Sequence, residues 1–133
     1  DINFLFTYPN FDYGADTLIK ILNNYKHQKN FKIIKNFGKN FYSVLAKSNG
    51  IIGNSSSAIL EAPSLGVYSL NIGNRQEGRL YAKTIINSDG NNFLDIKNKI
   101  FEISKRKKLS DCNLYSKKNT YSKIAKKIES LLK

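Results

Sequence analysis

Several residue types and sequence features are missing from this chain of 133 residues, and each absence excludes a class of protein. The chain has no methionine and opens with apolar residues directly after Asp1, which predicts a fragment or an excised domain. Cys112 is the single cysteine, so an intrachain disulfide is excluded and a reducing, cytoplasmic compartment is expected. No apolar run reaches the roughly 18 residues of a membrane span and no basic-then-apolar leader is present, so we expect no membrane partner.

Histidine is almost absent as well, and this limits the chemistry that the chain can carry. His27 is the only one, and it follows the first expected helix in a polar, lysine-rich run. No second His or Cys stands at metal-ligand spacing, so we predict no zinc site and no other cofactor. A hydrolytic triad would need a His beside a nucleophile, and nothing in the chain supplies that pair. We therefore assign no catalytic residue.

Positive charge is abundant, but arginine is scarce. The formal net charge is +12, yet only three of the 22 basic residues are arginine, namely Arg75, Arg79 and Arg106. Proteins that read phosphates and bases favour the planar, forked guanidinium over the ammonium of lysine. The lysines are also scattered along the chain rather than clustered. We therefore interpret the charge as solvated surface, with attraction for anionic metabolites as the alternative interpretation, and we expect no nucleic-acid partner.

Short apolar segments alternate with amphipathic ones along the chain. Apolar runs rich in β-formers predict strands over residues 2–8, 31–34, 51–52, 68–72 and 84–87. Helical spacing of apolar residues predicts helices over residues 16–25, 40–47, 55–65, 93–104 and 121–133. Pro63 is expected to kink or end the third of these helices early, and residues 105–118 are expected to form a loose polar connection.

This alternation predicts an α/β fold with a Rossmann-like, doubly wound parallel sheet. By length the chain is one domain, residues 1–133, in which residues 105–133 form a basic tail with a terminal helix. Ligands of such sheets bind beyond the carboxyl ends of the strands. We therefore expect the loops at residues 8–14, 36–41, 53–57 and 71–79 to lie at one edge of a single sheet.

The loop at residues 53–57 has the composition of an anion site. Gly53 and Asn54 leave a strand, and Ser55, Ser56 and Ser57 enter a helix. The first turn of a helix offers unpaired N–H groups and partial positive charge, and serine hydroxyls add donors. Helix capping is the alternative interpretation, but one cap needs only one such residue.

Three charged residues downstream point to the same chemistry. Glu61 stands among apolar residues of the expected helix, where a carboxylate needs partners, and the hydroxyls of a ribose would serve. Arg75 and Arg79 flank a polar turn and are able to clamp a diphosphate. A salt bridge or an exposed helix face for Glu61, and pairing of the arginines with Glu77, are the alternatives. In the first loop, Asn10 and Asp12 by themselves indicate no more than a turn or a helix cap.

The run GNSSSAILEAPSLGVYSLNIGNRQEGR, residues 53–79, resembles the signature of the hydrolysing UDP-N-acetylglucosamine 2-epimerases. These enzymes supply sugars for sialic and legionaminic acid synthesis. TYPNFDYG, residues 7–14, resembles the TxPNxDxG loop of the same family, and NFGKNFYSVL, residues 36–45, resembles its approach to the nucleobase. The resemblance covers residues 1–104. It departs from the family at Tyr68, Ala58 and Glu77, where Pro, Gly and Lys are frequent.

The resemblance implies the C-terminal half of a glycosyltransferase-B-type enzyme with two Rossmann-like domains, of which the N-terminal domain is absent here. It implies that the full-length protein is a homo-oligomer, and that a UDP-sugar is the substrate. The resemblance implies that Ser55 and Ser56, with Ser57 beside them, bind the diphosphate, and that Arg75 and Arg79 lie near the phosphates. It implies that Glu61 binds the ribose. Asn10 would contact the nucleotide side of the cleft, and Phe41 and the backbone near Phe37 would flank the uracil. Uridine and guanosine are not distinguished.

The implied reaction eliminates UDP and then hydrates the glycal at C1, with opposite stereochemistry at C2, to N-acetylmannosamine or a related sugar. The acid and base carboxylates of the family lie in the absent half, so this chain is expected to bind the leaving UDP and to be inactive alone. Two alternatives stay open: a nucleotide-sugar glycosyltransferase of the same fold, and a fragment that only binds.

Overall fold

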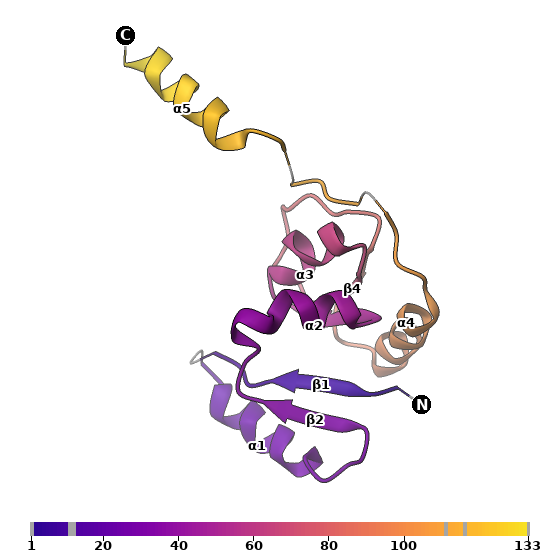
Figure 1. Ribbon diagram of the computed structural model, residues 1–133. Helices are drawn as coiled ribbons and strands as arrows, with labels where there is room; N and C mark the ends of the chain where they lie inside the picture. Colours follow the sequence, from indigo (N-terminus) through magenta and orange to yellow (C-terminus); the bar gives the residue numbers. More distant parts are fainter. Residues whose placement is uncertain (1, 11–12, 111, 116, 133) are drawn as a thin grey trace. The chain divides into compact units, whose positions relative to one another are not determined.

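The computed structural model describes residues 2–10, 13–110, 112–115 and 117–132, and its class is α/β with parallel strands, as expected. The chain divides into two compact units, residues 1–48 and residues 49–133. The described strands form a two-stranded sheet and a three-stranded sheet, not the single sheet that the alternation predicted. Figure 1 shows the elements of each unit.

The first unit is a βαβ arrangement closed by a short helical segment. Its elements are β1 (Phe4–Thr7), α1 (Ala15–Tyr25), β2 (Phe31–Ile34), the 3₁₀ helix η1 (Gly38–Asn40) and α2 (Phe41–Lys47). Strands β1 and β2 are parallel, with Phe4 opposite Phe31. The ring of Phe31 lies 5.2 Å from those of both Phe4 and Phe6, and 5.7 Å from that of Tyr25 on α1. This aromatic cluster holds the helix against the sheet.

The second unit contains the remaining elements and a sheet of three parallel strands in the order β3-β4-β5. In chain order they are β3 (Gly50–Gly53), α3 (Ser57–Leu60), the 3₁₀ helix η2 (Ala62–Leu65), β4 (Tyr68–Ile72), β5 (Ile85–Ser88), α4 (Phe93–Lys105) and α5 (Thr120–Leu131). Because all three strands are parallel, the segments that follow β3, β4 and β5 leave from the same edge of this sheet.

Strand β4 is central, and its two faces carry different partners. Tyr68 and Leu70 pack with Ile103 of α4 into the core of the unit. On the opposite face, the Ser69 hydroxyl donates to the Ala58 carbonyl at 2.6 Å and ties α3 to the strand. Both faces of β4 are covered, as is usual for parallel strands, and its polar residues Ser69 and Asn71 are therefore buried as well.

Pro63 shortens the helix that the sequence predicted over residues 55–65. That prediction is wrong in length, because α3 has only four residues and gives way to the 3₁₀ helix η2, with Pro63 in its first turn. Proline has no N–H for an α-helical bond and its ring disfavours helical backbone at the preceding residue. Gly66, at φ 66°, then turns the chain toward β4.

The connection after α4 is fixed to the sheet where it was predicted to be loose. The Arg106 guanidinium lies 4.9 Å from the centre of the Tyr68 ring and also donates to its hydroxyl at 3.3 Å. The Leu109 N–H donates to the Gly66 carbonyl at 3.1 Å. We call residues 106–109 the strap. A side chain at Gly66 would meet the strap at once, since a Cβ there would lie 1.9 Å from the Leu109 carbonyl oxygen.

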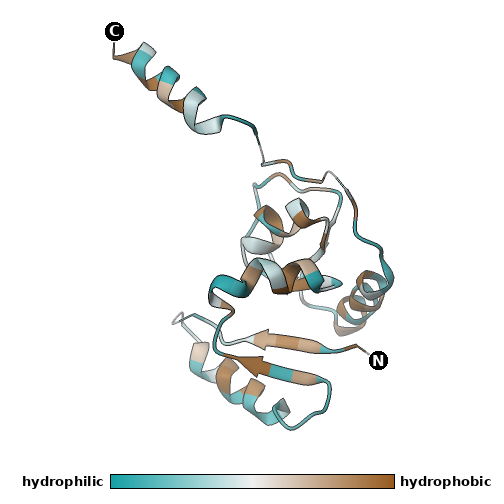
Figure 2. Cartoon of the chain, in the orientation of Figure 1, coloured by the Kyte–Doolittle hydropathy of each residue, from teal (hydrophilic) through white to brown (hydrophobic). Residues whose placement is uncertain are grey.

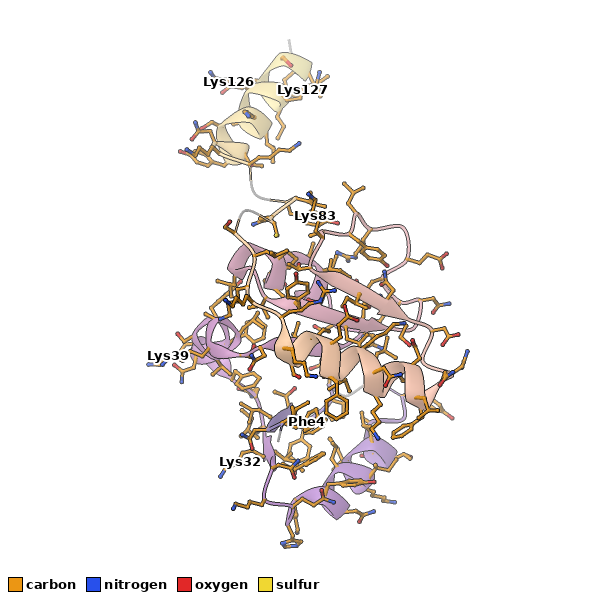
Figure 3. The ribbon with its side chains drawn as sticks, turned by 90° about the vertical axis from the view of Figure 1, so that its right-hand side faces the viewer. Phe4, Lys32, Lys39, Lys83, Lys126 and Lys127 are labelled. Carbon is orange, nitrogen blue, oxygen red and sulfur yellow. The ribbon has the colours of Figure 1, made fainter. Side chains whose placement is uncertain are left out.

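Helix α5 is amphipathic, and Figure 2 shows its hydrophobic and hydrophilic residues alternating along the ribbon. No helix among the described residues is long and apolar enough to span a membrane. Figure 3 shows how the charge is presented: the labelled lysines project outward from the segments that carry them, and all are exposed, namely Lys32, Lys39, Lys83, Lys126 and Lys127. This arrangement agrees with the interpretation of the lysines as solvated surface.

Candidate functional site

The serine loop, residues 53–57, leaves the carboxyl end of β3 and is shaped by its own hydroxyl groups. The Ser57 N–H donates to the Ser55 hydroxyl at 3.3 Å, and α3 begins only at Ser57. Ser55 is exposed, whereas Ser56 and Ser57 are half-buried. With four residues, α3 sums few peptide dipoles, so the anion site predicted here depends on hydroxyl and N–H donors more than on a helix dipole.

The arginine loop, residues 73–79, leaves the carboxyl end of β4 and contacts the serine loop. The Gln76 side chain donates through Nε2 to the Asn54 carbonyl at 2.7 Å. Gly73 and Gly78, at φ 81° and 82°, turn the chain at each end of the loop. The structure therefore brings together the two segments that carry Ser55, Ser56, Ser57, Arg75 and Arg79.

Both arginines of this loop are available to a ligand. Arg75 and Arg79 are exposed, and neither makes an ion pair with any residue that the structure describes, Glu77 included. The alternative that these arginines serve to neutralise Glu77 therefore has no support from the structure. An exposed guanidinium, in a loop that contacts a loop with hydroxyl donors, is suited to a phosphate group, which accepts in a bidentate geometry.

Glu61 lies between α3 and η2 and has an unmet oxygen. Glu61 as a whole is half-buried, but its Oε2 atom is fully buried and has no hydrogen-bond partner among the described residues. Glu61 forms no salt bridge with any residue in the described part of the chain, so that alternative has no support there. A buried carboxylate oxygen without a donor is unfavourable, so a ligand with hydroxyl groups would remove that penalty.

Asn10 and Phe41 belong to the other unit. Asn10 is exposed after β1, and Phe41 opens α2, with its ring 6.1 Å from that of Phe37 and 5.5 Å from that of Tyr42. Asp12, which the sequence left as a turn or cap residue, lies outside the described residues. Asn10 lies in the segment that follows β1, whereas Phe41 is the first residue of α2 and follows the 3₁₀ helix η1. His27 is exposed in the turn after α1.

A second polar region at the same sheet edge was not foreseen from the sequence. An open hollow of about 510 Å³ lies between the ends of β4 and β5 and contains none of the predicted site residues. Its lining is rich in amides and carboxylates and comprises Asn71, Gly73, Asn74, Glu77, Tyr81, Asn87, Ser88, Asp89 and Asn91.

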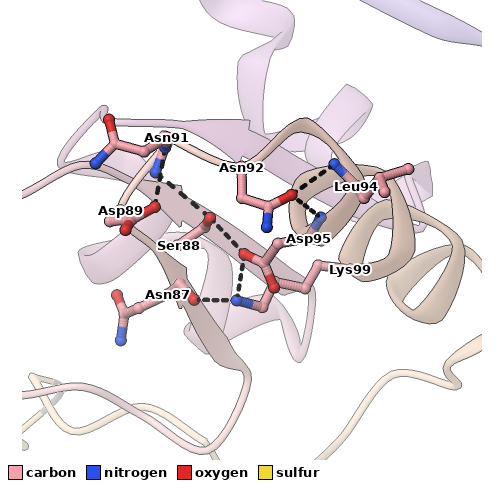
Figure 4. A network of polar contacts seen from close by, with 9 residues as sticks. Asn87, Ser88, Asp89, Asn91, Asn92, Leu94, Asp95 and Lys99 are labelled. Atoms are coloured by element: carbon pink, nitrogen blue, oxygen red, sulfur yellow. Dashed lines mark hydrogen bonds and ion pairs between the residues drawn. The ribbon is translucent and has the colours of Figure 1, made fainter.

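The polar network behind this hollow has a structural role that Figure 4 makes clear. Asn92 caps α4 by accepting from the N–H groups of Leu94 and Asp95 at 2.9 and 3.1 Å. The Asp95 carboxylate accepts from Lys99 and from Ser88, each at 2.7 Å. These hydrogen bonds, that from Lys99 first, hold the pKa of Asp95 below its usual 3.8. The signal was present in the sequence, because Asn92 directly precedes an apolar helical run.

Comparison with known proteins gives several relatives, among them two 2-epimerases. The chain is 40% identical over 90 residues to the GDP/UDP-N,N'-diacetylbacillosamine 2-epimerase (hydrolyzing) of Campylobacter jejuni, covering 65% of this chain and 23% of the relative. It is 36% identical over 88 residues to the UDP-N-acetylglucosamine 2-epimerase of Neisseria meningitidis, covering 65% and 23%. It is 35% identical over 85 residues to the polysialic acid biosynthesis protein P7 of Escherichia coli, covering 63% and 22%.

The chain therefore spans less than a quarter of the length of these relatives. A family profile described as UDP-N-acetylglucosamine 2-epimerase matches residues 1–129, which is nearly the whole chain. Its parallel α/β units agree with the Rossmann-like fold of that family. On this match, the chain belongs to the UDP-N-acetylglucosamine 2-epimerase family.

Proposed function

We propose that this chain is the nucleotide-binding half of a hydrolysing UDP-N-acetylglucosamine 2-epimerase. One observation carries the proposal: the Gln76–Asn54 hydrogen bond of 2.7 Å joins the serine loop to the arginine loop at one sheet edge. Hydroxyl donors and two unpaired guanidinium groups therefore belong to a single, connected structure. This is the composition that a diphosphate requires, and two of the relatives are named for UDP sugars.

Each residue has a proposed role in holding the nucleotide. Ser55 and Ser56, with Ser57 beside them, donate to the diphosphate, and Arg75 and Arg79 neutralise its charge. Glu61 accepts from the ribose hydroxyls through Oε2, the oxygen that has no hydrogen-bond partner among the residues that the structure describes. The resemblance places Asn10 on the nucleotide side and Phe41 beside the uracil.

In the proposed reaction, nucleotide binding and proton transfer are carried out by different parts of the enzyme. Elimination breaks the bond from C1 to the UDP oxygen and removes the proton from C2, and water then adds at C1 with inversion at C2. Donors to the diphosphate stabilise the charge that develops on the departing UDP, and this lowers the barrier to elimination. We assign the proton transfers to the half of the enzyme that this chain does not contain, and expect residues 1–133 alone to bind UDP weakly and turn over nothing.

Calorimetric titration of UDP into residues 1–133 tests the binding site. Glu61→Gln keeps the size of the side chain but removes its charge, and a hydrogen bond to a charged group contributes about 1.5–3 kcal/mol. The dissociation constant should therefore rise by about 10- to 100-fold, while the stability of the free protein does not fall, because Oε2 has no partner to lose. Ser56→Ala and Arg75→Ala should also weaken binding.

A matched control separates local contact from overall charge. Glu77→Gln removes another carboxylate, an exposed one in the arginine loop, and should leave the affinity unchanged or raise it. Unchanged affinity in Glu61→Gln, Ser56→Ala and Arg75→Ala together would reject the site. Product analysis on a full-length protein distinguishes the epimerase from a glycosyltransferase: free UDP and a 2-epimerised sugar without an acceptor support the first, and dependence on an acceptor supports the second.

A further inference from the structure

We propose that Gln76 is the positioning residue of this site: its side-chain amide holds the arginine loop against the serine loop in the unliganded protein. The inference rests on the proposed function for its consequence, since the two loops are those that would hold the diphosphate. The link itself is a property of the chain without any ligand.

The geometry sets Gln76 apart from its neighbours in the loop. It is only 4% exposed, whereas Arg75 and Glu77 on either side are exposed. Its side-chain Nε2 donates to the Asn54 main-chain carbonyl at 2.7 Å, and its main-chain carbonyl accepts from the Tyr81 hydroxyl at 3.0 Å. Since a carbonyl oxygen can only accept, the group of the amide that faces Asn54 must be the NH₂. Gln76 thus joins three segments of the unit through one buried residue.

Packing alone does not explain a glutamine at this position. Its Oε1 is buried and has no hydrogen-bond partner among the described residues. The penalty for an unpaired buried acceptor is as large as the gain from one neutral hydrogen bond, so the amide adds little to the stability of the fold. An apolar side chain of the same length would fill the space without that penalty. The feature that only the amide provides is the donor to Asn54.

Holding the loops together before the ligand arrives has a direct effect on affinity. The serines and the arginines come from segments about 20 positions apart in the chain, and ordering them on binding would cost entropy. A link already present in the free protein removes that cost. We therefore expect loss of the amide to weaken nucleotide binding without weakening the fold.

Gln76→Met is the variant that separates these two roles, because it keeps the length and removes both the donor and the unpaired acceptor. Thr84→Val is its matched control: Thr84 is fully buried and its hydroxyl is also unpaired, but it joins no loop. In both variants the thermal midpoint should stay within about 3 °C of the wild type. Amide hydrogen exchange of residues 54–57 and 74–79 should be about tenfold faster in Gln76→Met and unchanged in Thr84→Val.

Titration with UDP tests whether the link affects nucleotide binding. The dissociation constant should rise about tenfold in Gln76→Met and less than twofold in Thr84→Val. Gln76→Glu places a carboxyl that can donate to the Asn54 carbonyl only when protonated. Its affinity, taken relative to the wild type at each pH, should therefore recover as the pH falls through the pKa of the introduced carboxyl.

The two arms fail in different ways. If the wild type does not bind UDP, the proposed function fails, while hydrogen exchange in the free protein still decides whether Gln76 holds the loops. If Gln76→Met lowers the thermal midpoint by 10 °C or more and leaves loop exchange unchanged, Gln76 is a packing residue and the inference is overturned. Faster exchange with unchanged UDP affinity would also overturn it, because the link would then have no bearing on binding.

Discussion

Gly66→Ala should destabilise the second unit far more than an ordinary glycine substitution does. Gly66 has φ 66°, a conformation that costs a residue with a Cβ about 1–2 kcal/mol. The added Cβ would lie 1.9 Å from the Leu109 carbonyl oxygen, so the strap must move away. Its hydrogen bond to the Gly66 carbonyl, about 0.5–1.5 kcal/mol, would then be lost. The stacking of Arg106 on Tyr68 contributes about 0.5–1 kcal/mol to stability, and this contribution would be lost as well.

These contributions give a total loss of about 2–4 kcal/mol in the free energy of unfolding. Gly78→Ala isolates the backbone cost, because Gly78 has φ 82° and nothing within 4 Å of an added Cβ. It should cost only the backbone contribution of about 1–2 kcal/mol. Urea denaturation followed by far-ultraviolet circular dichroism measures both variants. Equal losses in Gly66→Ala and Gly78→Ala would refute the reasoning, since the strap would then contribute nothing to the fold.

Two further predictions concern the polar contacts that hold the sheet. Ser69→Ala should cost about 1–3 kcal/mol in thermal or urea unfolding, because the buried Ala58 carbonyl would lose its donor at 2.6 Å. Asp95→Asn should lower the thermal midpoint at pH 7, because it removes the carboxylate that Lys99 and Ser88 hold at the start of α4. The folded-state pKa of Asp95 is below 3.8, so its stabilisation is present above that pH and is lost as the pH falls through the folded value. The difference between Asp95→Asn and wild type should therefore shrink below pH 3.8, and a constant difference would contradict this origin.

Much of the local structure followed from periodicity, and the errors have identifiable causes. Strands β2 and β4 have the predicted bounds, and the other strands and most helices differ from prediction by a few residues at their ends. Helix α3 is short because Pro63 stops it. The sequence indicated an early end at this proline but not how few residues the helix would keep. The strap was missed because its attachment depends on a main-chain hydrogen bond to Gly66, which no side-chain pattern reveals.

The site residues of the serine and arginine loops were predicted from composition and resemblance, whereas Gln76, which joins these two loops, was not predicted. Ser55 and Arg75 are noticeable in a sequence because hydroxyl runs and arginine are informative in a lysine-rich chain. Gln76 is noticeable only in three dimensions, since a neutral amide inside a polar loop looks like an ordinary surface residue until its burial is known. The polar contacts at the start of α4 could have been predicted, because Asn92 and Asp95 form a recognisable helix start.

Buried polar atoms without hydrogen-bond partners show where the fold is less stable than it could be. Among the described residues, four buried side-chain atoms have no hydrogen-bond partner, and three of these belong to Glu61, Asn71 and Gln76. Asn71 lies near the carboxyl end of β4, Gln76 lies in the loop that follows it, and Glu61 lies just past the helix that follows β3. Proteins satisfy nearly all buried polar groups, and the exceptions concentrate where a ligand supplies the missing partner. Three of the four unpaired atoms therefore belong to elements near the edge where parallel sheets bind their ligands, while Thr84 directly precedes β5. This concentration is a reason independent of any resemblance to expect a polar ligand at that edge.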